Sequence, residues 1–181
     1  FTKSIMPNII TGTSYWGWAI SLSGILIALT SPFIGLIANN NAKRNPLFRL
    51  LTLLCIILTA TLFFSTPKSN HIATTLGVVV IANTAFELAL IIYNGYLYQL
   101  VEKQYYGRIS GWGWGSGYAG GLCVLVISLW LIGSGGFTSS NSLNIRVTSI
   151  LAAGWMLIFS LPLLVNLPRT KLKNIAPTKL K

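Results

Sequence analysis

Five long apolar stretches, separated by short polar links, dominate the sequence. They cover residues 14–38, 47–66, 72–99, 108–133 and 147–167. An α-helix needs about 20 apolar residues to cross the hydrocarbon core of a bilayer, and each stretch is about that long or longer. The pattern predicts an all-α, polytopic membrane helix bundle with five transmembrane helices. We expect a membrane domain over residues 1–167 and a basic tail over residues 168–181.

The composition agrees with a membrane protein. Of the 181 residues, 53% are hydrophobic and only 8% are charged, whereas soluble domains contain about 25% charged residues. The formal net charge of +11 could suggest a nucleic-acid partner. The basic residues, however, lie between and after the apolar stretches and not on one solvated face, which argues against nucleic acid. The expected partner is the lipid bilayer.

The distribution of lysine and arginine predicts the orientation. If the five stretches alternate in direction, one side of the membrane receives Lys43, Arg44, Arg49, Lys103, Arg108, Arg169, Lys171, Lys173, Lys179 and Lys181. The other side receives Lys3, Lys68 and Arg146. Cytoplasmic links carry the excess of positive charge, so we expect an external N-terminal side and a cytoplasmic tail.

The third stretch contains an acid in its middle, Glu87. At about 100° per residue of α-helix, Asn83, Glu87, Asn94 and Tyr98 fall within roughly 60° of one another. A charged side chain at this depth costs roughly 3 kcal/mol or more, so such residues face protein or a water-filled cavity and mark functional sites. No lysine or arginine lies in the interior of a stretch to pair with it.

Two interpretations of Glu87 stay open. Burial without a cationic partner favours the neutral carboxyl form, which suits proton coupling, and the polar face would then be a substrate or proton-coupling site. Alternatively, a neutral Glu87 hydrogen-bonds to Asn83 or to a neighbouring helix backbone and only fixes packing.

Small residues form stripes on two of the predicted helices. The first stretch carries Gly17, Ser21, Gly24, Ala28, Ser31 and Gly35 at steps of three and four residues. The fourth carries Gly111, Gly113, Gly115, Gly117 and Gly121. Such stripes let two membrane helices approach closely, so we expect helix packing here. The run from Gly115 to Gly120 also matches a dinucleotide-binding pattern, but it lacks the preceding strand and the following acid that this reading requires.

No other pattern indicates chemistry. Cys55 and Cys123 lie in apolar stretches and are expected to be buried free thiols. His71 is expected in an exposed link, with no partner at metal-ligand spacing. The sequence contains no Ser-His-acid set, metal cluster or phosphate loop, so we expect no enzyme activity, no cofactor and no metal.

Three segments resemble one family of transporters. The segment Gly35-Leu-Ile-Ala-Asn39-Asn-Asn-Ala42-Lys43-Arg44 is similar to the Gly-xxx-Asp-xx-Gly-Arg-Arg/Lys loop of the major facilitator superfamily. The segment from Ala82 to Asn94 resembles the fourth span, and Arg108 to Gly121 the fifth span, of its vacuolar-effluxer-like branch. That branch includes the autophagy-related vacuolar amino-acid effluxer. The five stretches would correspond to spans two to six, part of an N-terminal half.

The resemblance implies a secondary transporter that moves small polar solutes, possibly amino acids, by alternating access between two halves. It implies a cytoplasmic gate loop of Gly35, Asn39, Lys43 and Arg44, in which the two cations engage neighbouring helix ends. Two departures weaken that loop, because Asn39 stands where the signature has an acid and Ala42 where it has a glycine.

The extent of the sequence leads to further expectations. It begins with Phe1 and shows no signal peptide, so we expect a first span and a C-terminal half to be supplied by a longer protein or by another chain. The expected location is a bacterial inner membrane. The alternative is a non-transporting membrane module, either a degenerate half-transporter or a partner-binding subunit.

Overall fold

The computed structural model describes residues 9–38, 40–66, 71–133 and 143–167, without the side chains of residues 9–11, 41 and 97–100. It contains five long helices: α2 (Ile9–Ala38), α3 (Asn41–Thr61), α4 (Ile72–Leu100), α5 (Tyr106–Gly133) and α6 (Leu143–Val165). Two short 3₁₀ turns, η1 (Leu62–Phe64) and η3 (Lys103–Tyr105), follow α3 and precede α5. All five helices are long and apolar enough to cross a membrane, which confirms the predicted all-α bundle of five transmembrane helices.

Helix α3, which corresponds to the second apolar stretch, begins earlier than the apolar pattern indicates. Asn40 has an extended backbone, and its side-chain Oδ1 accepts a hydrogen bond of 3.0 Å from the amide of Ala42. An asparagine in this position caps a helix, because it satisfies an amide that has no partner within the helix. The basic residues Lys43 and Arg44 therefore lie in the first turn of α3, although the apolar stretch begins only at residue 47.

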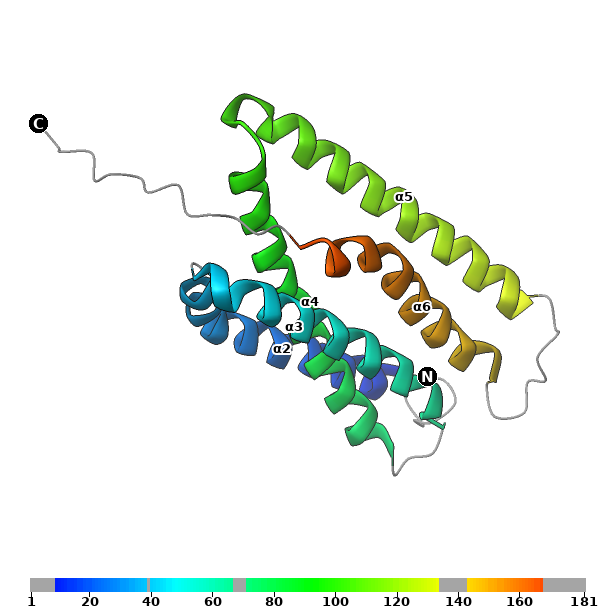
Figure 1. Cartoon of the computed structure of the whole chain (residues 1–181). Helices are drawn as coiled ribbons and strands as arrows, with labels where there is room; N and C mark the ends of the chain where they lie inside the picture. The colour runs from blue at the N-terminus through cyan, green and yellow to red at the C-terminus, as the bar shows by residue number, and fades with distance from the viewer. Residues whose placement is uncertain (1–8, 39, 67–70, 134–142, 168–181) are drawn as a thin grey trace, which may run out of the picture.

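The helices pack around α3 and α4. In Figure 1, α4 crosses α2 and α3, and α6 lies between α3 and α5. The buried core lies between α3, α4 and the end of α6. Its members are Phe48, Leu51, Cys55, Ala85, Leu88, Ala89, Ile92, Tyr96, Leu164 and Leu167.

Polar contacts join the helices at both ends of the bundle. At the end where α3 begins, Tyr96 Oη donates to Asn45 Oδ1 at 2.7 Å and Arg49 Nε donates to the Leu164 carbonyl at 3.0 Å. At the opposite end, Arg146 Nε donates to the Phe63 carbonyl, and its guanidinium stacks 4.9 Å from the Phe63 ring. These contacts join α3 to α4 and α6, and the η1 turn after α3 to α6.

Helix α5 has no buried residue among those described, and it packs mainly on α6. One close approach occurs at Gly120, where an added Cβ atom would lie 3.6 Å from Trp155 Nε1 of α6. The exposure of α5 corrects one prediction. Cys55 is buried, as expected, but Cys123 on α5 is exposed, because no other described helix covers that face.

Candidate functional site

Glu87 lies in the middle of α4. It follows Ile72 by fifteen residues, about 22 Å along the helix axis. Its side chain is half-buried, and it has no hydrogen-bond or ion-pair partner among the residues that the structure describes.

The two sides of α4 have different surroundings. Ala85, Leu88 and Ile92 point into the core against α3 and α6. At 100° per residue, Glu87 and Asn94 fall on the opposite side of the helix. Asn94 is exposed and Glu87 is half-buried, so the polar side of α4 is turned away from the packed core.

Asn83 connects this polar side to α2. Its Nδ2 donates to Ser23 Oγ at 2.9 Å, and Ser23 Oγ in turn donates to the Ile20 carbonyl at 2.9 Å. Ser23 is only 1% exposed. The packing interpretation predicted that Glu87 would bond to Asn83 or to a neighbouring helix backbone. Asn83, one turn before Glu87 on α4, bonds instead to Ser23 of the neighbouring helix α2. The structure therefore separates Asn83, which has a packing contact, from Glu87 and Asn94.

The sequence pattern does not single out Ser23, although Ser23 lies in the first apolar stretch. The predicted stripe follows Gly17, Gly24 and Gly35, and an added Cβ atom at any of these would have no other heavy atom within 4 Å among the described residues. Ser23 lies beside that stripe and not on it. Its hydroxyl, with one donor and two acceptor positions, was the only available signal.

The predicted gate loop contains one buried cation. Arg44 is only 2% exposed, and its guanidinium carbon lies 4.4 Å from the centre of the Tyr96 ring on α4. Phe48 packs edge-on against the same ring at 5.9 Å. Arg44 thus contacts the end of a neighbouring helix, while Lys43 is exposed.

The remaining predicted residues are only partly described. Asn39 lies outside the described residues, and so does the side chain of Tyr98. Gly35 is exposed at the end of α2. Sequence reasoning did not identify Tyr96, which joins Arg44 and Asn45 to α4. A tyrosine in a span containing several others gives no individual signal.

The glycine stripe of α5 faces open space within the described residues. An added Cβ atom at Gly111, Gly113, Gly115, Gly117 or Gly121 would have no other heavy atom within 4 Å. The packing role of these glycines stays a prediction. Within the same described ranges, no group of three or more His, Cys, Asp or Glu side chains could hold a metal ion.

Fold and site together define a multi-pass helical membrane protein with an acid in the middle of one long apolar helix, α4. Two comparisons with known proteins bear on its family. A family model described as "Vacuole effluxer Atg22 like" matches residues 98–179. An uncharacterised MFS-type transporter of Bacillus subtilis (strain 168), YxiO, is 24% identical over 155 residues, which is 84% of this chain and 36% of that protein. No solved structure matches the chain.

These matches confirm the resemblance to the vacuolar-effluxer-like branch of the major facilitator superfamily. The chain spans about a third of the length of the curated relative.

Proposed function

We propose that this chain forms part of a secondary transporter for small polar solutes, with Glu87 as the group that binds and releases the coupled proton. One observation carries the proposal: a carboxyl group in the middle of α4, on the side turned away from the core, has no polar partner among the described residues. Acids inside membrane helices are costly and are found in proton relays and substrate pathways. The match to an MFS-type transporter supports the same class.

Amino acids are the proposed substrates. The polar side of α4 offers a carboxylate at Glu87 and an amide at Asn94. The carboxylate suits the ammonium group of an amino acid, and the amide can donate hydrogen bonds to its carboxylate. Protonation of Glu87 would remove its attraction for the ammonium group, which couples solute binding to the proton.

The loop from Gly35 to Arg44 is the proposed cytoplasmic gate. Its signature acid is replaced by Asn39, so an ion pair of the usual kind is not available from that position. The stacking of Arg44 on Tyr96 supports a different latch, in which a buried cation holds the ends of α3 and α4 together. The two helix ends would then move as one unit during alternating access.

The two acids of the chain provide a matched test. The protein that carries this chain is reconstituted in vesicles, and amino-acid counterflow is measured between pH 5 and 8 for wild type, Glu87→Gln and Glu102→Gln. Glu102 is exposed and accepts a hydrogen bond from Gln104 Nε2 at 2.8 Å. We expect Glu87→Gln to abolish the pH dependence of transport and Glu102→Gln to preserve it.

The opposite result would exclude a proton-coupling role for Glu87. If Glu87→Gln transports at the wild-type rate with the wild-type pH profile, Glu87 serves packing only. A Glu87→Asp variant that recovers the pH profile would separate the loss of the carboxyl group from a general loss of structure.

A second candidate function is a non-transporting, partner-binding module. It is favoured by Gly17, Gly24 and Gly35 of α2 and by the glycine stripe of α5, which have open space around them within the described residues. If the reconstituted protein moves no amino acid, this function is tested by co-purification of a membrane partner. Gly117→Leu should then release the partner, because a bulky side chain on the stripe prevents close helix approach.

A further inference from the structure

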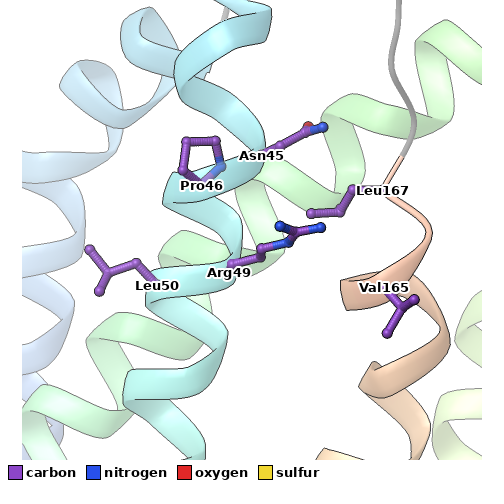
Figure 2. A pocket seen from close by; sticks show the side chains of 6 residues that line it. All are labelled: Asn45, Pro46, Arg49, Leu50, Val165 and Leu167. Carbon is purple, nitrogen blue, oxygen red and sulfur yellow. The ribbon is translucent and has the colours of Figure 1, made fainter.

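A groove of about 510 Å³ lies between the beginning of α3 and the end of α6. It is lined by Asn45, Pro46, Arg49, Leu50, Val165 and Leu167 (Figure 2). Figure 2 shows the Arg49 side chain reaching from α3 toward Leu167 and the end of α6. None of the residues proposed for transport lines this groove.

The groove contains an exposed cation without an acidic partner. Arg49 uses its Nε to donate to the Leu164 carbonyl, and it forms no ion pair within the described part of the chain. A guanidinium has five N–H donors in a fixed planar arrangement. The donors of its two amino groups therefore stay available to an anion, and phosphate oxygens fit them in a bidentate manner.

The Arg49 guanidinium is held in place before any anion binds. The Leu164 carbonyl belongs to the last turn of α6, where carbonyl groups have no partner within the helix. The hydrogen bond from Arg49 satisfies this carbonyl, and the negative end of the helix dipole attracts the cation. Because the side chain is already ordered, an anion that binds it pays less conformational entropy.

Four of the six lining side chains are apolar, and two of these are largely exposed. Leu50 is 62% exposed and Val165 is 66% exposed. In a membrane-spanning chain these side chains are suited to contact lipid acyl chains. Arg49 lies two residues after the start of the apolar stretch at residue 47, so we expect the cation near one membrane interface. A cation at the interface beside apolar walls is complementary to a phospholipid, which joins an anionic headgroup to acyl chains.

We propose that this groove binds an anionic phospholipid, with the headgroup phosphate on Arg49 and an acyl chain along Leu50 and Val165. The positive charges of the sequence predict that this end of the bundle faces the cytoplasm. The cytoplasmic leaflet carries anionic lipids, and basic pockets between membrane helices on that side bind their headgroups. The bound lipid would neutralise Arg49 and join α3 to α6.

The test compares lipid retention by native mass spectrometry. The protein that carries this chain is purified in a neutral detergent and incubated with equal amounts of phosphatidylglycerol and phosphatidylcholine. The variant Arg49→Gln keeps an N–H donor for the Leu164 carbonyl but removes the charge. The control is Arg108→Gln, which removes an exposed arginine of α5 that does not line the groove. Thermal unfolding in neutral detergent shows whether each variant is folded.

We expect wild type and Arg108→Gln to retain phosphatidylglycerol in preference to phosphatidylcholine. Arg49→Gln should lose about fivefold of that preference, the change expected for one cation at an anionic lipid. Arg49→Lys keeps the charge and should keep most of the preference. Because glutamine also keeps a donor for the Leu164 carbonyl, the two variants separate the effect of the charge from that of the hydrogen bond to α6. Val165→Trp, which fills the groove without changing its charge, provides a second test and should also reduce retention.

Three outcomes overturn the proposal. The first is equal retention of the two lipids by wild type, and the second is an unchanged preference in folded Arg49→Gln. The third is competition by millimolar inorganic phosphate that abolishes lipid retention, which would assign the groove to a small anion. None of these outcomes bears on transport by Glu87, because the two sites share no residue.

Discussion

Helices α4 and α5 are both apolar and of nearly the same length, yet their environments differ. Helix α4 contributes Ala85, Leu88, Ala89, Ile92 and Tyr96 to the buried core. Helix α5 has no buried side chain among the described residues, and its stripe of glycines has open space around it. An apolar helix surface can contact either lipid or another helix. The two helices therefore differ in their contacts and not in their composition.

The difference between α4 and α5 indicates which substitutions should change stability and which should change function. The interface of α3, α4 and α6 combines tightly packed apolar side chains with hydrogen bonds at both ends. The polar side of α4 and the glycine stripe of α5 lie outside this interface. Substitutions in the interface should therefore change the free energy of unfolding, and substitutions outside it should change transport or assembly.

The largest effect on stability is expected at Ile92, which is only 1% exposed in the core. Ile92→Ala leaves a cavity and should lower the free energy of unfolding by about 2–5 kcal/mol. The matched control is Ile158→Ala on α6, where the side chain is 66% exposed and the expected change is within about 0.5 kcal/mol. Reversible unfolding in mixed micelles measures both. If both variants lowered the free energy of unfolding equally, the core and the exposed faces would not differ in their contribution to stability.

A smaller effect is expected at the buried cation of α3. Arg44→Gln removes the guanidinium from the Tyr96 ring and should cost about 2 kcal/mol, the value for a desolvated cation–π contact. Its neighbour Lys43 is exposed, so Lys43→Gln should change the free energy of unfolding by less than about 0.5 kcal/mol. The same unfolding measurement applies. If the two variants behaved alike, Arg44 would not hold α3 against α4.

The smallest effect is expected at the contact between α2 and α4. Ser23→Ala, Asn83→Ala and the double variant form a cycle that isolates the hydrogen bond between the two side chains. Interhelical hydrogen bonds of this kind contribute about 0.6 kcal/mol on average, so we expect a coupling energy of that size. A coupling energy of zero would mean that the bond does not hold α2 on α4.

Much of the fold could be predicted from the sequence, because bilayer thickness limits how long an apolar helix must be. Glu87 was identifiable for the same reason, since an acid within an apolar stretch is costly. The helix partners were not predictable. Sides of a membrane helix that face lipid and sides that face protein can both be apolar, so the sequence does not distinguish the exposed Cys123 from the buried Cys55.

The polar contacts between helices could not be predicted from the sequence either. Ser23 with Asn83, Arg44 with Tyr96 and Arg49 with the Leu164 carbonyl join residues that are 60, 52 and 115 positions apart. One of these acceptors is a backbone carbonyl, which any residue would supply. Only the packing of the helices brings these groups within bonding distance.

The central claim, that Glu87 exchanges the coupled proton, is tested most directly by infrared difference spectroscopy of the reconstituted protein with and without amino acid. The account predicts a solute-induced change in the band of a protonated carboxyl group that is present in wild type and Glu102→Gln and absent in Glu87→Gln. The same band in Glu87→Gln, or no solute-induced carboxyl band in wild type that transports, would contradict it.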